Sequence, residues 1–205
     1  MTHKALILDF GGVLTSDLWE SIRDCARREG LPAEALLDLL RKDPEIREQF
    51  AGLERGTVSQ VDFESHLGAA AGIAPDRLLN RMTASLQPDE PMLAEVARLR
   101  AQGVATAVLS NSWGTGHFDP YDGYDLKNRV DTVVISDQVG LRKPDPEIFQ
   151  LILDRLDVKA SEAVFVDDLA VNLEPARALG MAVIHHTLTA TTIAELQRLF
   201  TPSTE

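Results

Sequence analysis

Residues 5–15 read ALILDFGGVLT, an apolar run that ends in an aspartate and continues into two glycines. Four comparable runs follow: VATAVL at 104–109, TVVI at 132–135, AVFV at 163–166 and AVIH at 182–185. They are short and rich in β-branched residues without strict alternation, which is typical of strands buried on both faces of a parallel sheet. Asp9 stands out because a strand with a purely structural role does not need a carboxylate at its end.

The segments between the later runs have helical periodicity. In 145–157, and again in 169–179, apolar residues recur at helical spacing, and Gly180 is well placed to end the second helix. Strands that alternate with helices predict an α/β fold with right-handed crossovers, here a Rossmann-like parallel sheet.

The interval between the first two runs is too long for a single crossover. A crossover helix needs about a dozen residues, whereas residues 9–103 intervene here and read as helices separated by Gly and Pro. We expect residues 16–88 to form an inserted helical cap. The α/β core then consists of 1–15 and 89–205, with the helix near 90–102 belonging to it.

Polar residues follow each predicted strand. They are Asp9, then Ser110 and Asn111, Ser136 and Asp137, Asp167 and Asp168, and finally His185 and His186. Because ligands bind outside the carboxyl ends of strands in open parallel sheets, these residues should converge on one crevice. Asp, Asn and Ser singly are also good helix N-caps. The set taken together favours a functional site.

Composition and charge disfavour several classes of partner. The formal charge of −12 and the scattered Lys and Arg disfavour nucleic acid. No apolar run approaches the roughly 18 residues needed to span a membrane, and a signal peptide is not evident. Cys25 is the only cysteine, so it cannot form an internal disulfide, and we interpret it as a structural side chain in a cytoplasmic protein.

Four motifs carry a family resemblance. They are DFGGVLT at 9–15, VLSNS at 108–112, GLRKPDPEIF at 140–149 and FVDDLAVNLEPARALGM at 165–181. Through them nearly the whole chain resembles the haloacid dehalogenase-like hydrolase superfamily. It is most similar to the phosphatase domain of soluble epoxide hydrolases, which has a helical cap inserted after the first strand.

The resemblance implies a role for each motif residue. Asp9 would be the nucleophile that attacks phosphorus and becomes an aspartyl phosphate. Ser110 would hydrogen-bond a phosphoryl oxygen, helped by backbone N–H groups near Gly12 and Asn111. Lys143 would bring positive charge to the nucleophile and the phosphoryl group. The substrate would be a small phosphorylated metabolite, because a cap excludes water and restricts access.

A metal ion is expected at the same place. Asp167 and Asp168 brought near Asp9 would repel one another without a cation, and hard oxygen ligands favour Mg²⁺. The resemblance implies that Asp168 is a direct ligand and that Asp167 assists it. Gly11 would offer its backbone carbonyl, and Asn172 would pack around the site.

Gly11 departs from the family pattern. Phosphatases of the superfamily usually have an aspartate there, which protonates the leaving oxygen and then activates water, a contribution of about 10²–10⁴ in rate. Three hypotheses remain open. The first, which we prefer, is a phosphatase whose acid comes from the cap or solvent, or whose substrates, such as acyl, aryl or anomeric phosphates, have leaving groups that need little protonation. The second is a catalytically weakened protein that binds a phosphorylated ligand or a partner, and the third is a 2-haloacid dehalogenase.

The remaining candidate side chains are weaker. His117, His185 and His186 do not have the spacing of a metal site, and we interpret them as structural or surface residues. Trp113 either lines the pocket or covers the core.

Overall fold

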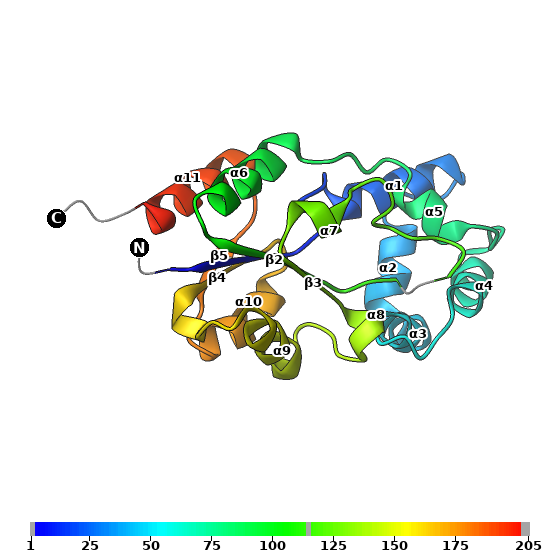
Figure 1. The fold of residues 1–205 in the computed structure, drawn as a ribbon. Coiled ribbons are helices and arrows are strands. Elements are labelled where there is room, and N and C mark those ends of the chain that lie inside the picture. The colour runs from blue at the N-terminus through cyan, green and yellow to red at the C-terminus, as the bar shows by residue number, and fades with distance from the viewer. Residues whose placement is uncertain (1–2, 114–115, 202–205) are drawn as a thin grey trace.

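The structure, a computed structural model, describes residues 3–113 and 116–201 (Figure 1). Five parallel strands form one sheet in the order β3-β2-β1-β4-β5. Their bounds are β1 Ala5–Leu8, β2 Ala105–Ser110, β3 Thr132–Ile135, β4 Ala163–Asp167 and β5 Ala182–His185. The predicted α/β fold with a parallel sheet is confirmed. β1 is central, which explains why its residues are apolar on both faces.

Helices cover both faces of the sheet and continue beyond one end of it. The core helices are α6 Glu90–Ala101, α7 Leu126–Arg129, α8 Ser136–Val139, α9 Pro146–Leu156, α10 Ala170–Ala178 and α11 Thr189–Phe200, with a 3-10 turn at Ala160–Glu162. In Figure 1, α6 and α11 lie on one face of the sheet, and α9 and α10 lie on the other. The helices predicted near 90–102, 145–157 and 169–179 are confirmed as α6, α9 and α10, and their ends agree with the prediction to within two residues.

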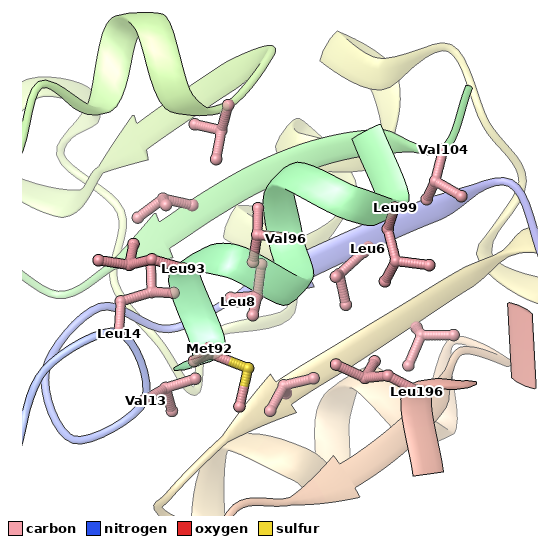
Figure 2. Packing of buried hydrophobic residues seen from close by; sticks show 14 of the residues in the cluster. Leu6, Leu8, Val13, Leu14, Met92, Leu93, Val96, Leu99, Val104 and Leu196 are labelled. Carbon is pink, nitrogen blue, oxygen red and sulfur yellow. The ribbon is translucent and has the colours of Figure 1, made fainter. Parts of the chain in front are cut away.

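The side chains of β1 alternate between two hydrophobic layers. Leu6 and Leu8 pack with residues of α6 and α11, as Figure 2 shows for Val96, Leu99 and Leu196. The other two residues of β1 belong to the layer under α9 and α10. Burying the side chains of Leu6, Ile7 and Leu8 contributes roughly 1.5–3 kcal/mol each, so this strand is held firmly from both sides. The position of Asp9, the next residue, is fixed as a result.

The segment between β1 and α6 forms a separate helical group. Its helices are α1 Leu18–Arg28, α2 Ala35–Lys42, α3 Pro44–Glu54, α4 Gln60–Ala71 and α5 Leu78–Thr83. They share a hydrophobic cluster of their own, in which Cys25 is fully buried. Figure 1 shows them gathered beyond the end of the sheet toward which β2 and β3 point. Trp113, just after β2, also belongs to this cluster.

Two connecting segments join this helical group to the sheet, and they lie side by side. Thr15 forms an antiparallel bridge with Pro88. The Ser16 amide donates to the Gln87 carbonyl at 2.7 Å, and the Asp89 amide donates to the Leu14 carbonyl at 2.9 Å. The chain therefore leaves and re-enters the core at one place. No helix within 3–113 and 116–201 has the length and apolar character needed to cross a bilayer.

Candidate active site

The acidic residues of the first and fourth motifs meet at the carboxyl end of the sheet. β1 and β4 pair in register, with Leu8 opposite Val166, and the Asp9 amide donates to the Val166 carbonyl at 2.9 Å. This pairing brings Asp9 beside Asp167 and Asp168. The three carboxylates each offer an oxygen, and these oxygens lie within 4.8 Å of one another. These three acids thus lie together as expected. Four other strand-end residues do not belong to this cluster or line the cavity over it: Ser136, Asp137, His185 and His186.

Lys143 lies between two of the carboxylates. Its Nζ is 2.9 Å from Asp9 Oδ1 and 2.7 Å from Asp167 Oδ2, and the residue is 1% exposed. Burial by itself would lower the pKa of Lys143, but the charges of Asp167 and Asp9 outweigh it and raise that pKa above its usual value. The ammonium group therefore stays charged at neutral pH.

Asn111 holds the backbone of Lys143. Its side-chain Nδ2 donates to the Lys143 carbonyl at 2.9 Å, and its Oδ1 accepts from the Lys143 amide at 2.8 Å. The amide side chain thus ties the end of β2 to the loop that carries the lysine. This contact fixes the direction from which the ammonium approaches Asp9.

Asp167 is the most completely bonded of the three acids. It accepts from the Leu169 amide at 2.8 Å, from Asn172 Nδ2 at 3.0 and 3.1 Å, and from Lys143 Nζ. It is also fully buried. Both of its oxygens already have partners, so it fits an assisting role better than that of the main metal ligand.

The negative charges of Asp9 and Asp168 are less well balanced by hydrogen bonds and nearby positive charge than that of Asp167. Burial raises the pKa of Asp9 to about 7, with Asp167 and Asp168 adding to the rise and Lys143 opposing it. Burial and the neighbouring Asp167 raise the pKa of Asp168 to about 6. Three hard carboxylates with one buried ammonium among them suit a divalent cation such as Mg²⁺. The side chains present therefore fit the expected metal.

Gly12 allows a close approach of backbone to Asp168. Its φ is +78°, and a Cβ added there would lie 3.1 Å from Asp168 Oδ2. The left-handed conformation and the short distance both favour glycine. The Gly12 amide, which was expected to help bind phosphate, donates to Thr15 Oγ1 at 3.0 Å in this structure.

The backbone conformation at position 11 does not require glycine, in contrast to position 12. Its φ lies outside the left-handed region, and an added Cβ would meet Leu18 Cδ2 at 3.4 Å, an ordinary van der Waals contact. The site could therefore accommodate a β-carbon at position 11. Neither the backbone conformation nor the space for a β-carbon therefore requires glycine at this position.

Ser110 has a partner that the sequence did not reveal. Tyr121 Oη donates to Ser110 Oγ at 2.9 Å, and the Tyr121 ring packs against Phe10 with centroids 4.8 Å apart. Burial raises the pKa of the Tyr121 hydroxyl above its usual value, so it stays a neutral donor. Ser110 Oγ accepts from Tyr121, and its own hydrogen is donated to the Asn111 carbonyl oxygen at 3.3 Å.

A cavity of about 90 Å³ lies over these residues. Its core side includes Asp9, Gly11, Ser110, Asn111, Lys143 and Asp168, and its other side is formed by Leu18, Trp19, Phe50, Glu54, Thr83 and Leu86. Trp113 lines it too, so that this residue both borders the pocket and packs in the helical cluster. The helical side is mostly apolar and aromatic.

Trp19 and Glu54 were not among the sequence candidates. Trp19 Nε1 donates to Asp168 Oδ2 at 3.3 Å, and the Arg41 guanidinium lies 5.0 Å from the Trp19 ring centroid. The sequence predicted helices between 16 and 88, but it does not reveal which helix face meets the strand ends. Glu54 ends α3, where an acidic residue gives no sequence signal of burial.

The three histidines have local partners. His185 Nε2 is 2.9 Å from the Asp168 carbonyl oxygen, His186 Nδ1 is 3.0 Å from Thr192 Oγ1, and His117 Nε2 is 3.3 Å from Glu64 Oε2. His185 therefore supports the backbone of an acidic residue from behind. None of the three belongs to the acidic cluster found among the described residues.

Comparison with known proteins gives consistent matches. A family model described as haloacid dehalogenase-like hydrolase matches residues 3–180. Sesquiterpene phosphatase astK of Aspergillus oryzae is 32% identical over 202 residues, which cover 97% of this chain and 97% of that protein. Bifunctional epoxide hydrolase 2 of Rattus norvegicus is 34% identical over 130 residues, covering 60% of this chain but only 23% of that protein.

Solved structures agree in fold. The HAD family enzyme bt-2542 of Bacteroides thetaiotaomicron has a TM-score of 0.72 at 20% identity, covering 98% of this chain and 100% of that one. The same enzyme in complex with magnesium and inorganic phosphate has a TM-score of 0.66 at 20% identity, covering 90% and 94%. At this identity the similarity shows the arrangement of the sheet and helices.

Proposed function

Because the chain belongs to the haloacid dehalogenase-like hydrolases, as its four motifs predicted, we propose that it is a Mg²⁺-dependent phosphatase. The observation that carries the proposal is the cluster of Asp9, Asp167 and Asp168 around Lys143. This excess of negative charge suits a divalent cation and a phosphate ester. It has no evident use in halide displacement, which disfavours the dehalogenase alternative.

Four residues would hold the metal. Asp9 and Asp168 have the least compensated carboxylates, the Gly11 carbonyl follows the family pattern, and Asp167 would support the cluster. When bound, Mg²⁺ supplies charge neutralisation at the phosphoryl oxygens. A similar fold solved with magnesium and inorganic phosphate supports this assignment.

The chain's own side chains would carry out the phosphoryl transfer. Asp9 attacks phosphorus and becomes an aspartyl phosphate, which water then hydrolyses. Lys143, held by Asn111, keeps its positive charge beside the nucleophile. Ser110, whose oxygen accepts a hydrogen bond from Tyr121, would turn its own hydrogen from the Asn111 carbonyl to a phosphoryl oxygen.

Residues 16–88 would act as a cap over the core of 1–15 and 89–205. Two features support this: the helices have their own hydrophobic cluster, and the two connecting segments pair near Thr15 and Pro88. A body attached at one place can swing without unfolding. Closing it over the strand ends would exclude water from the reacting phosphate.

The substrate would be a small phosphorylated molecule with an apolar body. The cap side of the cavity presents Leu18, Trp19, Phe50 and Leu86, which offer apolar contacts. The relative that matches over nearly its whole length is a sesquiterpene phosphatase, whose name indicates an apolar substrate. The present cavity of about 90 Å³ is smaller than the roughly 150 Å³ that holds benzene. A larger substrate would therefore enter only with the cap displaced.

Gly11 supports a second candidate function. A chain that lacks the usual acid could bind a phosphorylated ligand and turn it over poorly. The same cavity and the same cluster would then serve recognition alone.

The two candidates differ in turnover. A phosphatase should hydrolyse para-nitrophenyl phosphate and a panel of apolar phosphate monoesters with Mg²⁺, and should lose this activity when a chelator removes the metal. If the protein shows no turnover of any ester but inorganic phosphate protects it against thermal unfolding, the binding function is favoured. Metal-independent halide release from a 2-haloacid would contradict both.

A further inference from the structure

The geometry of phosphoryl transfer indicates where a proton donor must lie. The attacking and leaving oxygens are roughly in line through phosphorus. Since Asp9 attacks from the sheet, the leaving oxygen faces the opposite side of the cavity. That side is formed by residues of the cap, among them Trp19, Phe50 and Glu54. A residue that protonates the leaving group can therefore come from the cap.

Glu54 is the carboxylate in that position. Among the described residues, three carboxylates line the cavity: Asp9, Asp168 and Glu54. The first two belong to the acidic cluster at the strand ends. Glu54 ends α3 on the cap and is only 5% exposed, which is rare for a glutamate unless it has a charged partner.

Charged neighbours face Glu54 from the core. Arg142 Nη2 lies 2.5 Å from Glu54 Oε2. The charge of Lys143 and the polar side chain of Asn111 also favour the ionised form of the Glu54 carboxylate. Burial nevertheless raises the pKa of Glu54 above its usual value, because it outweighs the lowering by Arg142 and Lys143. The group thus keeps a proton to a higher pH than an exposed glutamate, and Arg142 stabilises the carboxylate once the proton has left.

The end of α3 is fixed against the core. Arg55 Nη2 lies 3.3 Å from Asp145 Oδ2, which follows the loop of Arg142. Gly56 lies so close to α8 that an added Cβ would be 2.6 Å from the Asp137 carbonyl. These contacts hold the Glu54 carboxylate at the cavity when the cap is closed.

Tyr121 is the main competing donor, and it fits the role less well. Its hydroxyl donates to Ser110 from the core side of the site. Its raised pKa means that the tyrosinate left after proton transfer would be unstable in this buried, acidic surrounding. A group that must first give a proton and then accept one needs two accessible charge states.

We propose that Glu54 is the general acid and base of the reaction, taking the place of the side chain that is missing at Gly11. This inference rests on the proposed phosphatase function. In the first step Asp9 bonds to phosphorus, the bond to the leaving oxygen breaks, and that oxygen takes the proton of Glu54. In the second step the Glu54 carboxylate takes a proton from a water molecule while the oxygen of that water bonds to phosphorus. The bond to Asp9 then breaks, which releases phosphate.

The test compares two monoesters in Glu54→Gln. Hexyl phosphate has an alkoxide leaving group that needs a proton, whereas para-nitrophenolate leaves as a stable anion. For hexyl phosphate we expect kcat/KM to fall by about 10²–10⁴-fold. For para-nitrophenyl phosphate we expect a fall in kcat/KM that is at least roughly ten times smaller than the fall for hexyl phosphate. The wild type should also lose hexyl phosphate activity at high pH, where Glu54 is deprotonated, and this limb should be absent in the variant.

Two further variants test the position and the chemistry of the acid. Arg55→Met breaks the ion pair with Asp145 that helps to hold Glu54 at the cavity, so we expect kcat/KM to fall more for hexyl phosphate than for para-nitrophenyl phosphate, and by less than in Glu54→Gln. Equal losses on both esters in Arg55→Met would contradict the role of Glu54. Gly11→Asp placed on the Glu54→Gln background returns an acid to the family's position, where a Cβ fits. We expect this double variant to regain hexyl phosphate turnover relative to Glu54→Gln.

The outcomes are distinguishable. Equal losses on both esters in Glu54→Gln, with an unchanged pH profile, would overturn the role of Glu54 and leave the phosphatase function intact. A wild type that hydrolyses para-nitrophenyl phosphate but not hexyl phosphate would also overturn it, because no general acid would then be at work. A wild type that hydrolyses neither ester would overturn the proposed function together with this inference.

Discussion

The two sides of the cavity are built differently. On the core side, side chains are fixed by several partners each: Asp167 has Lys143, Asn172 and a backbone amide, and Lys143 is held through both its backbone and its ammonium group. On the cap side, Trp19 and Glu54 reach the core through one or two contacts amid apolar side chains. The rigid side suits a reaction common to many substrates. The sparser side suits selection of the substrate and the proton transfer that we propose to depend on cap closure.

The largest effect should come from removing the nucleophile on the core side. Asp9→Asn keeps the shape of the side chain but cannot form an aspartyl phosphate. We expect kcat/KM for para-nitrophenyl phosphate to fall by about 10⁴-fold or more, the scale on which an essential catalytic group acts. Steady-state kinetics with saturating Mg²⁺ measures this. A loss below tenfold would show that chemistry does not depend on the core side as described.

Lys143 should matter for folding as well as for activity. Lys143→Met leaves Asp9 and Asp167 buried without their shared cation, and removing one partner of such a pair costs about 3–5 kcal/mol. Urea unfolding should show this loss in the free energy of unfolding. Lys127→Met, which changes an exposed lysine on α7, is the matched control and should stay near the wild type. An unchanged urea midpoint in Lys143→Met would contradict the assignment of Lys143 as the main internal counter-charge.

The adjacent glycines give a matched pair of smaller effects. Gly12→Ala forces a Cβ into a left-handed conformation 3.1 Å from Asp168 Oδ2 and should cost about 1–3 kcal/mol in unfolding free energy. Gly11→Ala places a Cβ at ordinary contact distance from Leu18 and should be tolerated. Equal destabilisation of the two variants would show that the backbone turn after Asp9 is not arranged as described.

The smallest effect tests the cap side. Trp19→Phe keeps the aromatic wall but removes the hydrogen bond to Asp168 Oδ2. A loss of about 0.5–1.5 kcal/mol corresponds to about two- to tenfold in kcat/KM. The loss should be shared by aryl and alkyl esters, in contrast to Glu54→Gln. A strong preference for one leaving group in Trp19→Phe would assign proton transfer to a different part of the cap.

The sequence predicted the core side well because its signals are local. A buried strand is a short apolar run, and the residue after it necessarily lies at the edge of the sheet, so Asp9, Ser110 and Asp167 could be placed together before any coordinates. Lys143 was assigned through its motif. Its depth between two carboxylates follows from the fold and could not be read from spacing.

The cap side could not be predicted in the same detail. Helical periodicity shows that residues share a face, but the face that meets the core depends on how five helices pack together. Nothing in the sequence distinguishes Glu54 from the other acidic residues, and its ionic partner Arg142 lies far away along the chain. Tyr121 lies in a connection without periodicity, so nothing in the sequence linked it to Ser110.

The central claim is that phosphate passes through Asp9, and an acid-quenched single turnover tests it most directly. After reaction with para-nitrophenyl phosphate and Mg²⁺, peptide mass spectrometry should find one phosphoryl group on the peptide that contains Asp9. The same peptide from Asp9→Asn should be unmodified. Phosphate release by the wild type without any phosphorylated Asp9 peptide, together with continued turnover by Asp9→Asn, would contradict the account.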